Sequence, residues 1–200
     1  ALPQDVSAGE LAQGEEWYSF DYANAHFVML DTEASKLDQQ AAWMQDDLGK
    51  LDRQKTPWVF AVFHKMPYSC ASTHQGDTEA PRAAWQPVFD QFKVDFVIAG
   101  HVHNYQRTLP IRGFKPGTGD GQVAQADANG APVAESGTVY VVSGGAGADL
   151  YGVDPVSSCE FSKITEKTNN YVTIEIEART LRYQALRLDG SQIESFEYTK

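Results

Sequence analysis

Two uninterrupted apolar segments, each followed by a histidine, constrain the fold of this chain more than any other feature. Trp58–Phe63 and Phe96–Ala99 lack the alternation of a half-exposed strand, so each is expected to be a strand covered on both faces within a sheet. The first segment stops at His64 and the second at Gly100-His101. In an open α/β sheet, ligands bind beyond the carboxyl ends of the strands, which is where these histidines would lie.

Helical and strand patterns alternate around these segments. Apolar residues recur every three or four positions from residue 35 to 54, with Ser35 placed to cap a surface helix. A second helix is expected from about Pro81, bent or shortened by Pro87. Residues 113–137 are rich in glycine and are expected to form a long surface excursion with little regular structure.

The remaining segments have the pattern of strands. They are residues 17–22, 26–31, 138–143, 171–178, 181–188 and 192–198, with Asp189-Gly190 as the turn of the last hairpin. The order strand, helix, strand, helix, strand, followed by a β-rich C-terminus, predicts the α/β class. The 200 residues are expected to fold as one domain or as part of one.

The charge balance argues against two kinds of partner. Sixteen basic and twenty-seven acidic side chains give a formal net charge of −11, without a basic cluster, so neither nucleic acid nor a membrane surface is an expected partner. No apolar run approaches the roughly 20 residues of a membrane span. The first five residues lack the regions of a signal peptide, so any export signal is expected to have been removed.

The two cysteines, Cys70 and Cys159, occur in segments that read as surface loops. We expect one disulfide between them, which would indicate an oxidising compartment. Two unrelated free thiols are the alternative.

Four of the five histidines lie between residues 64 and 103. In extended backbone the side chains of His101 and His103 would project to the same side, so both could reach a pair of metals about 3.5 to 4 Å apart. Gly100 would let the backbone approach a metal cluster or adopt positive φ. A lone His-x-His is a weak signal, and two solvated loop residues are the alternative. His26 begins a strand and is expected to be hydrogen-bonded structurally.

The residues around these histidines resemble a known family. The segments 62–69 (Val-Phe-His-Lys-Met-Pro-Tyr-Ser) and 100–107 (Gly-His-Val-His-Asn-Tyr-Gln-Arg) resemble the last two metal-binding blocks of the calcineurin-like metallophosphoesterases. Tyr105 and Arg107 make the second block similar to the purple acid phosphatase branch, and segments 17–33 and 137–147 agree. The resemblance implies half of a four-layer α/β/β/α sandwich, with a mixed sheet and helices on one face.

The same resemblance implies a site and a reaction. His64 and His101 would bind one metal and His103 the other, while His74 would contact the substrate phosphate and protonate the leaving group. The implied enzyme is a secreted or periplasmic acid phosphatase that hydrolyses small phosphate monoesters. Its two metal ions would be iron paired with zinc, manganese or iron.

Part of the implied site is missing. The family's Asp-x-Gly, Gly-Asp-x-x and Gly-Asn-His-Asp/Glu blocks do not occur in this sequence, and in the family they precede the segment with which this chain begins. We therefore expect a C-terminal part of a catalytic domain whose N-terminal half is absent. Without a bridging carboxylate, the three imidazoles are expected to bind metal weakly.

Three other functions stay open. The chain could belong to a phosphodiesterase or nucleotidase of the same superfamily, or it could be a noncatalytic β-rich interaction module with incidental histidines. A mononuclear zinc site built from His64, His101 and His103 is the third, since three histidines suffice for a catalytic zinc.

Overall fold

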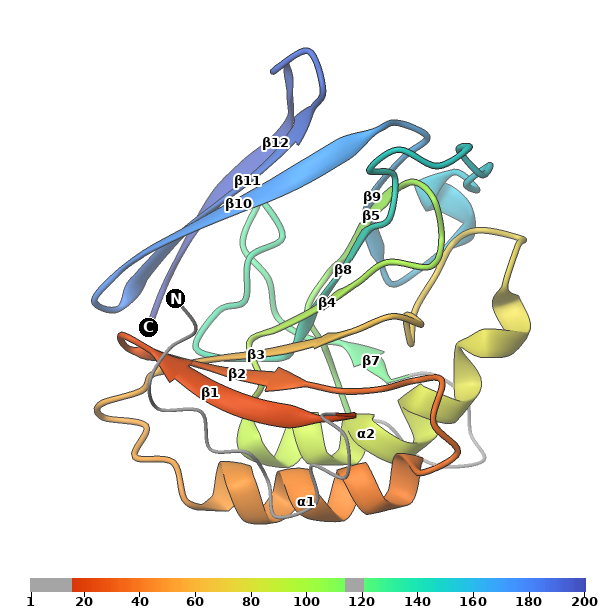
Figure 1. Cartoon of the computed structure of the whole chain (residues 1–200). Helices are drawn as coiled ribbons and strands as arrows, with labels where there is room; N and C mark the ends of the chain where they lie inside the picture. Colours follow the sequence, from red (N-terminus) through yellow and green to blue (C-terminus); the bar gives the residue numbers. More distant parts are fainter. Residues whose placement is uncertain (1–15, 114–120) are drawn as a thin grey trace.

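The largest layer of the protein is a mixed sheet (Figure 1), seen in a computed structural model that describes residues 16–113 and 121–200. Within these residues the sheet has seven strands in the order β1-β2-β3-β4-β8-β5-β9. They are β1 (Tyr18–Tyr22), β2 (Ala25–Met29), β3 (Trp58–Phe63), β4 (Phe96–Ala99), β8 (Val139–Ser143), β5 (Tyr105–Thr108) and β9 (Ser162–Glu166). Strands β2, β3, β4 and β8 run parallel, and β1, β5 and β9 join them in antiparallel pairing.

The two apolar segments are central strands, as their sequences predict. β3 lies between β2 and β4, and β4 lies between β3 and β8. Five of the six residues of β3 are buried, because one face of the sheet packs on helices and the other on a second sheet. The structure confirms the α/β class.

Both α-helices of the described residues cover one face of the sheet (Figure 1). Helix α1 spans Leu37–Gly49 and α2 spans Glu79–Phe92. The N-cap residue of α1 is Lys36, and no side chain forms a capping hydrogen bond there. The prediction that Ser35 caps this helix is therefore wrong. Helix α2 begins before Pro81 and continues past Pro87, so the expected shortening does not occur. Neither helix is long and apolar enough to cross a membrane, a finding that covers the described residues.

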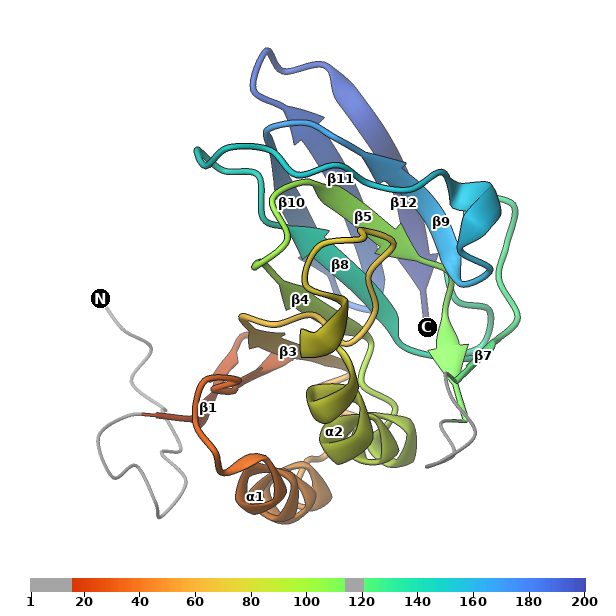
Figure 2. The same cartoon turned by 90° about the vertical axis from the view of Figure 1, so that its right-hand side faces the viewer.

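A separate antiparallel sheet packs on the opposite face (Figure 2). Its strands are β10 (Asn170–Glu177), β11 (Thr180–Arg187) and β12 (Gln192–Thr199), and the turn at Asp189-Gly190 has its glycine at φ 82°, as a hairpin requires. The apolar contacts between the two sheets form a second core, distinct from the one under the helices. The β-rich C-terminus is therefore confirmed.

The sequence analysis missed β5 and β9, because neither has the apolar content of a strand. β5 reads Tyr-Gln-Arg-Thr and is nevertheless buried along its whole length between β8 and β9. Between residues 113 and 137, of which 114–120 lie outside the described residues, the short strand β7 (Gln122–Val123) pairs with β6 (Ile111–Arg112). The excursion thus has slightly more regular structure than expected.

The predicted disulfide is present between Cys70 and Cys159, which are 89 residues apart in the sequence. Closing a loop of that length restricts the unfolded chain by about 4 kcal/mol in the entropic model. Cys70 is 1% exposed, so it does not lie in a surface loop as expected. The bond joins the segment after β3 to the segment after β8.

His26 has the structural role that the sequence predicts. Its Nδ1 lies 2.7 Å from Asp21 Oδ1 and its Nε2 lies 2.9 Å from Asp47 Oδ2. Burial by itself lowers the pKa of His26, but the hydrogen bonds with Asp47 and Asp21 outweigh it, and the pKa is raised above 6.5. The histidine therefore joins β1, β2 and α1 most tightly when it is charged.

This arrangement predicts a pH-dependent stability. Because the folded-state pKa of His26 is the higher one, its contribution is complete below about pH 6.5 and is lost as the pH rises through the folded-state value. The free energy of unfolding, measured in urea, should therefore fall more for His26→Gln at pH 6 than at pH 9. An equal loss at both pH values would contradict this role.

Candidate metal centre

The pairing of two parallel strands brings His64 and His101 together. Phe63 of β3 is the register partner of Ala99 of β4, so the residues that follow leave the sheet side by side. His101 Nδ1 lies 3.0 Å from His64 Nε2, and the ring centroids are 4.8 Å apart. Two nitrogens at about this separation can share one transition metal at Zn–N distances of about 2.1 Å.

The backbone between His101 and His103 is not extended, contrary to the sequence analysis. His101 has φ 63°, in the left-handed region, and Val102 N donates to Gly100 O at 2.7 Å in a tight turn. The positive φ falls on the histidine and not on Gly100. A Cβ at Gly100 would meet its nearest atom, His64 Nδ1, at 3.9 Å, which is an ordinary contact. The two histidines therefore reach the site from a turn.

His103 lies at the edge of the same cluster. Its Nδ1 lies 2.9 Å from the carbonyl oxygen of Asp149, and because a carbonyl only accepts, Nδ1 carries the proton. Nε2 is then the nitrogen with a free lone pair, as in a metal-binding histidine that a second partner orients. The ring of His103 stacks on Tyr151 at 4.2 Å, and Tyr151 lies 5.5 Å from the ring of His74.

His74 and Asp77 complete the cluster from the segment between β3 and α2. The ring of His74 lies 4.2 Å from that of His101. Asp77 Oδ2 lies 3.0 Å from His101 Nε2 and 3.2 Å from His74 Nδ1. An ionised carboxylate only accepts, so it holds the proton of His101 on Nε2 and leaves Nδ1 as the possible ligand atom.

Asp77 and Tyr151 were not expected from the sequence. An acidic residue three positions after the loop histidine His74 was nevertheless a usable signal for Asp77. Nothing in the local sequence marks Tyr151, which reaches the site because its segment folds back over the histidine turn. Its backbone N donates to His103 O at 2.9 Å.

The surroundings favour neutral imidazole at His64. Burial, followed by the proximity of His101, lowers the pKa of His64 below 6.5. The hydrogen bond from His101 lowers the pKa of Asp77, which keeps this carboxylate ionised. Neutral imidazoles and an ionised carboxylate are the forms that coordinate metal.

The donor set fits a transition metal in part. His64 Nε2 and His101 Nδ1 lie 3.0 Å apart, and imidazole suits zinc, copper and iron. The Asp77 oxygen that lies near the nitrogens of His74 and His101 already accepts a hydrogen bond from each of these rings. In the described part of the chain, however, no carboxylate is placed between His101 and His103 to bridge two cations. The residues present therefore fit one half of a dinuclear site.

Comparison with known proteins finds one family model and several named relatives. Residues 7–105 match the model of the calcineurin-like phosphoesterase family. Purple acid phosphatase 21 of Arabidopsis thaliana is 42% identical over 106 residues, which are 52% of this chain and 24% of that protein. Phosphoenolpyruvate phosphatase of Allium cepa is 31% identical over 166 residues, which are 82% of this chain and 34% of that protein. The chain thus spans about a quarter to a third of the length of these relatives.

The structural comparison covers nearly the whole chain. The purple acid phosphatase PPD1 from yellow lupin (Lupinus luteus) seeds superposes on 92% of this chain and 32% of its own, with a TM-score of 0.73 and 28% identity. The chain belongs to the calcineurin-like phosphoesterases. Within that superfamily it falls in the branch of the purple acid phosphatases.

Proposed function

We propose that this chain carries the histidine half of the active site of a metal-dependent phosphatase that hydrolyses phosphate monoesters. The observation that carries the proposal is the meeting of His64 and His101 at 3.0 Å beyond two adjacent parallel strands, with His74 against His101. Relatives named as purple acid phosphatases and as a phosphoenolpyruvate phosphatase support the same reaction.

Each histidine has a separate task in this proposal. His64 Nε2 and His101 Nδ1 would hold one metal, and His103 Nε2 would hold the second. When bound, the two metals, iron with zinc, manganese or iron, supply Lewis acidity toward water and toward the phosphoryl group. Asp77 would orient His101 and His74, and Tyr151 would form the wall between His74 and His103.

His74 would act as the proton donor. With Asp77 accepting from Nδ1, the Nε2 side of the ring can face a substrate oxygen and deliver a proton to the leaving group. His74 is thus proposed as both a substrate-binding and a catalytic residue.

The site would be completed by a polypeptide segment that supplies the bridging carboxylates. The described structure offers a surface for such a partner: an apolar groove of about 300 Å³ lies between the main sheet and β10, and Phe27, Phe60, Ile174 and Ile176 line it. Tyr22, also in its lining, is 68% exposed. The disulfide supports a secreted or periplasmic location, because such bonds persist in oxidising compartments.

Metal analysis and kinetics of the completed protein test the proposal. We expect two transition metals per completed site and turnover of phosphoenolpyruvate and p-nitrophenyl phosphate well above that of bis(p-nitrophenyl) phosphate. Preferred cleavage of the diester would favour a phosphodiesterase. Absence of both metal and hydrolysis after reconstitution would support a noncatalytic module instead.

A further inference from the structure

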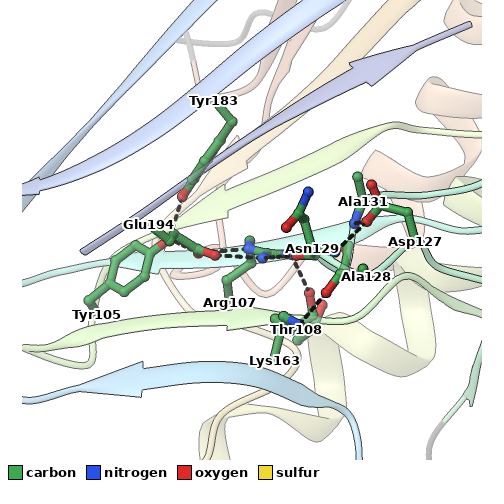
Figure 3. Close-up of polar contacts among 11 residues, drawn as sticks. Tyr105, Arg107, Thr108, Asp127, Ala128, Asn129, Ala131, Lys163, Tyr183 and Glu194 are labelled. Atoms are coloured by element: carbon green, nitrogen blue, oxygen red, sulfur yellow. Dashed lines mark hydrogen bonds and ion pairs between the residues drawn. The ribbon is translucent and has the colours of Figure 1, made fainter. Parts of the chain in front are cut away.

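Strand β5 continues directly from the histidine turn and has two different faces. Side chains of a strand alternate, so Tyr105 and Arg107 project to one side and Gln106 to the other. Figure 3 shows Tyr105 and Arg107 meeting Glu194 of the three-stranded sheet. Gln106 faces the segment that carries His74, on the side of the metal centre.

The amide of Gln106 is buried, and both of its heteroatoms are hydrogen-bonded. Its Oε1 accepts from Cys70 N at 2.6 Å, and its Nε2 donates to Ser69 Oγ at 3.1 Å and to Asn104 Oδ1 at 2.9 Å. The side chain belongs to a residue only 4% exposed. Buried amides with complete partners are rigid, because losing any one bond leaves a polar group unpaired.

These partners belong to the two segments that supply the histidines. Ser69 and Cys70 lie between His64 and His74, and Asn104 follows His103 directly. Gln75, the residue after His74, donates from its Nε2 to the carbonyl oxygen of Ser69 at 3.1 Å. Gln106 therefore connects the segment of His64 and His74 with the turn of His101 and His103 from beneath the cluster.

A third segment is attached to the same point. Gly144 N donates to Asn104 O at 3.2 Å, and Asp154 N donates to Cys70 O at 2.9 Å, so the stretch that carries Tyr151 is held at both ends by direct partners of Gln106. The disulfide attaches the same stretch to Cys70. The Gln106 amide thus contacts two of the three segments around the cluster directly, and the third is attached to its partners Asn104 and Cys70.

We propose that Gln106 is the positioning residue of the metal centre: its amide sets the spacing between the two histidine segments. It does not touch the metal or the substrate and acts through Cys70, Ser69 and Asn104. The effect of this residue on metal binding rests on the proposed function. The spacing between the two histidine segments, in contrast, is a property of the metal-free chain. Supporting partners of this kind change metal affinity by about 10- to 100-fold.

The decisive comparison is Gln106→Met against Tyr105→Phe. Methionine preserves the length and volume of glutamine but removes its hydrogen bonds, whereas Tyr105→Phe removes two hydrogen bonds, one buried and one partly buried, on the opposite face of the same strand. Both variants should lower thermal stability. Nuclear Overhauser contacts among the rings of His64, His74 and His101, measured in the metal-free chain, should weaken at least about twofold only in Gln106→Met. Replacing a residue that only stabilises the fold would leave the spacing of these rings unchanged.

Zinc titration of the same three proteins gives the second readout. We expect Gln106→Met to lose about tenfold in Zn²⁺ affinity and Tyr105→Phe to keep that of the unaltered chain. Unchanged ring contacts in Gln106→Met, or equal weakening in both variants, would overturn the positioning role. If the unaltered chain and its reconstituted form bind no zinc, the proposed function fails, while the ring contacts still decide the role of Gln106.

Discussion

Replacing His74 by alanine in the metal-loaded, completed enzyme is expected to lower kcat for a phosphate monoester by about 10²- to 10⁴-fold. General acid catalysis by a positioned side chain contributes an effect of this size. The imidazole lies against His101 and is oriented by Asp77, so its loss removes the proposed proton donor without removing a proposed metal ligand. Stopped-time assays at saturating substrate measure the effect, and metal content should stay unchanged.

The leaving group provides an internal check on that prediction. An alkyl phosphate needs a proton on its leaving oxygen far more than p-nitrophenyl phosphate does, so the loss in kcat should be larger for the alkyl ester. His26→Ala is the matched control, because that histidine is buried in a structural contact with Asp21 and Asp47 and should lower stability while leaving kcat unchanged. Equal losses for both esters in His74→Ala would argue against a proton donor.

The second large effect is expected at the other face of β5. Glu194→Leu should lower the free energy of unfolding by about 3 to 5 kcal/mol, because it leaves a buried cation without its partner. The side chain of Arg107 is 0% exposed, and its Nε lies 2.7 Å from Glu194 Oε1 (Figure 3). The carbonyls of Asn129 and Gly130 also accept from Arg107, but they carry no full charge.

Urea unfolding of two further variants isolates the ion pair. Glu197→Leu is the matched control, since Glu197 lies on the same strand and pairs with Arg182, but both side chains are more than half exposed. Exposed pairs contribute about 0 to 1 kcal/mol, so this variant should unfold nearly as the unaltered protein does. The double variant Arg107→Met and Glu194→Leu should recover most of the loss, because it removes the unpaired charge. A double variant as unstable as Glu194→Leu would mean that packing, and not charge, holds the two sheets together.

The local sequence pattern was sufficient to predict most of the strands and helices. The unbroken apolar segments predicted β3 and β4 as central strands, and the spacing of apolar residues predicted α1 to within a few residues at its start. Alternation and a Gly turn predicted β10 to β12. These features depend on neighbours within a few positions, which is the range over which sequence periodicity acts.

Strand β5 was missed because its burial comes from elsewhere in the chain. Its polar residues are covered on both faces by distant partners: Glu194 on one side, Ser69 and Cys70 on the other. No local pattern reports such partners. The same limit applies to the left-handed conformation of His101, which the turn after β4 imposes against the preference of a non-glycine residue.

The sequence by itself indicated which residue types lie at the candidate metal centre, since His64 and His101 each follow a buried strand. Only the tertiary structure decided how they meet: the register of β3 against β4 places the two rings together, and folding of separate segments adds Asp77, Tyr151 and Gln106. The physical reason is one of range. Strand and helix propensities act along the chain, whereas a site depends on sub-ångström spacing between groups that long-range packing alone brings into contact.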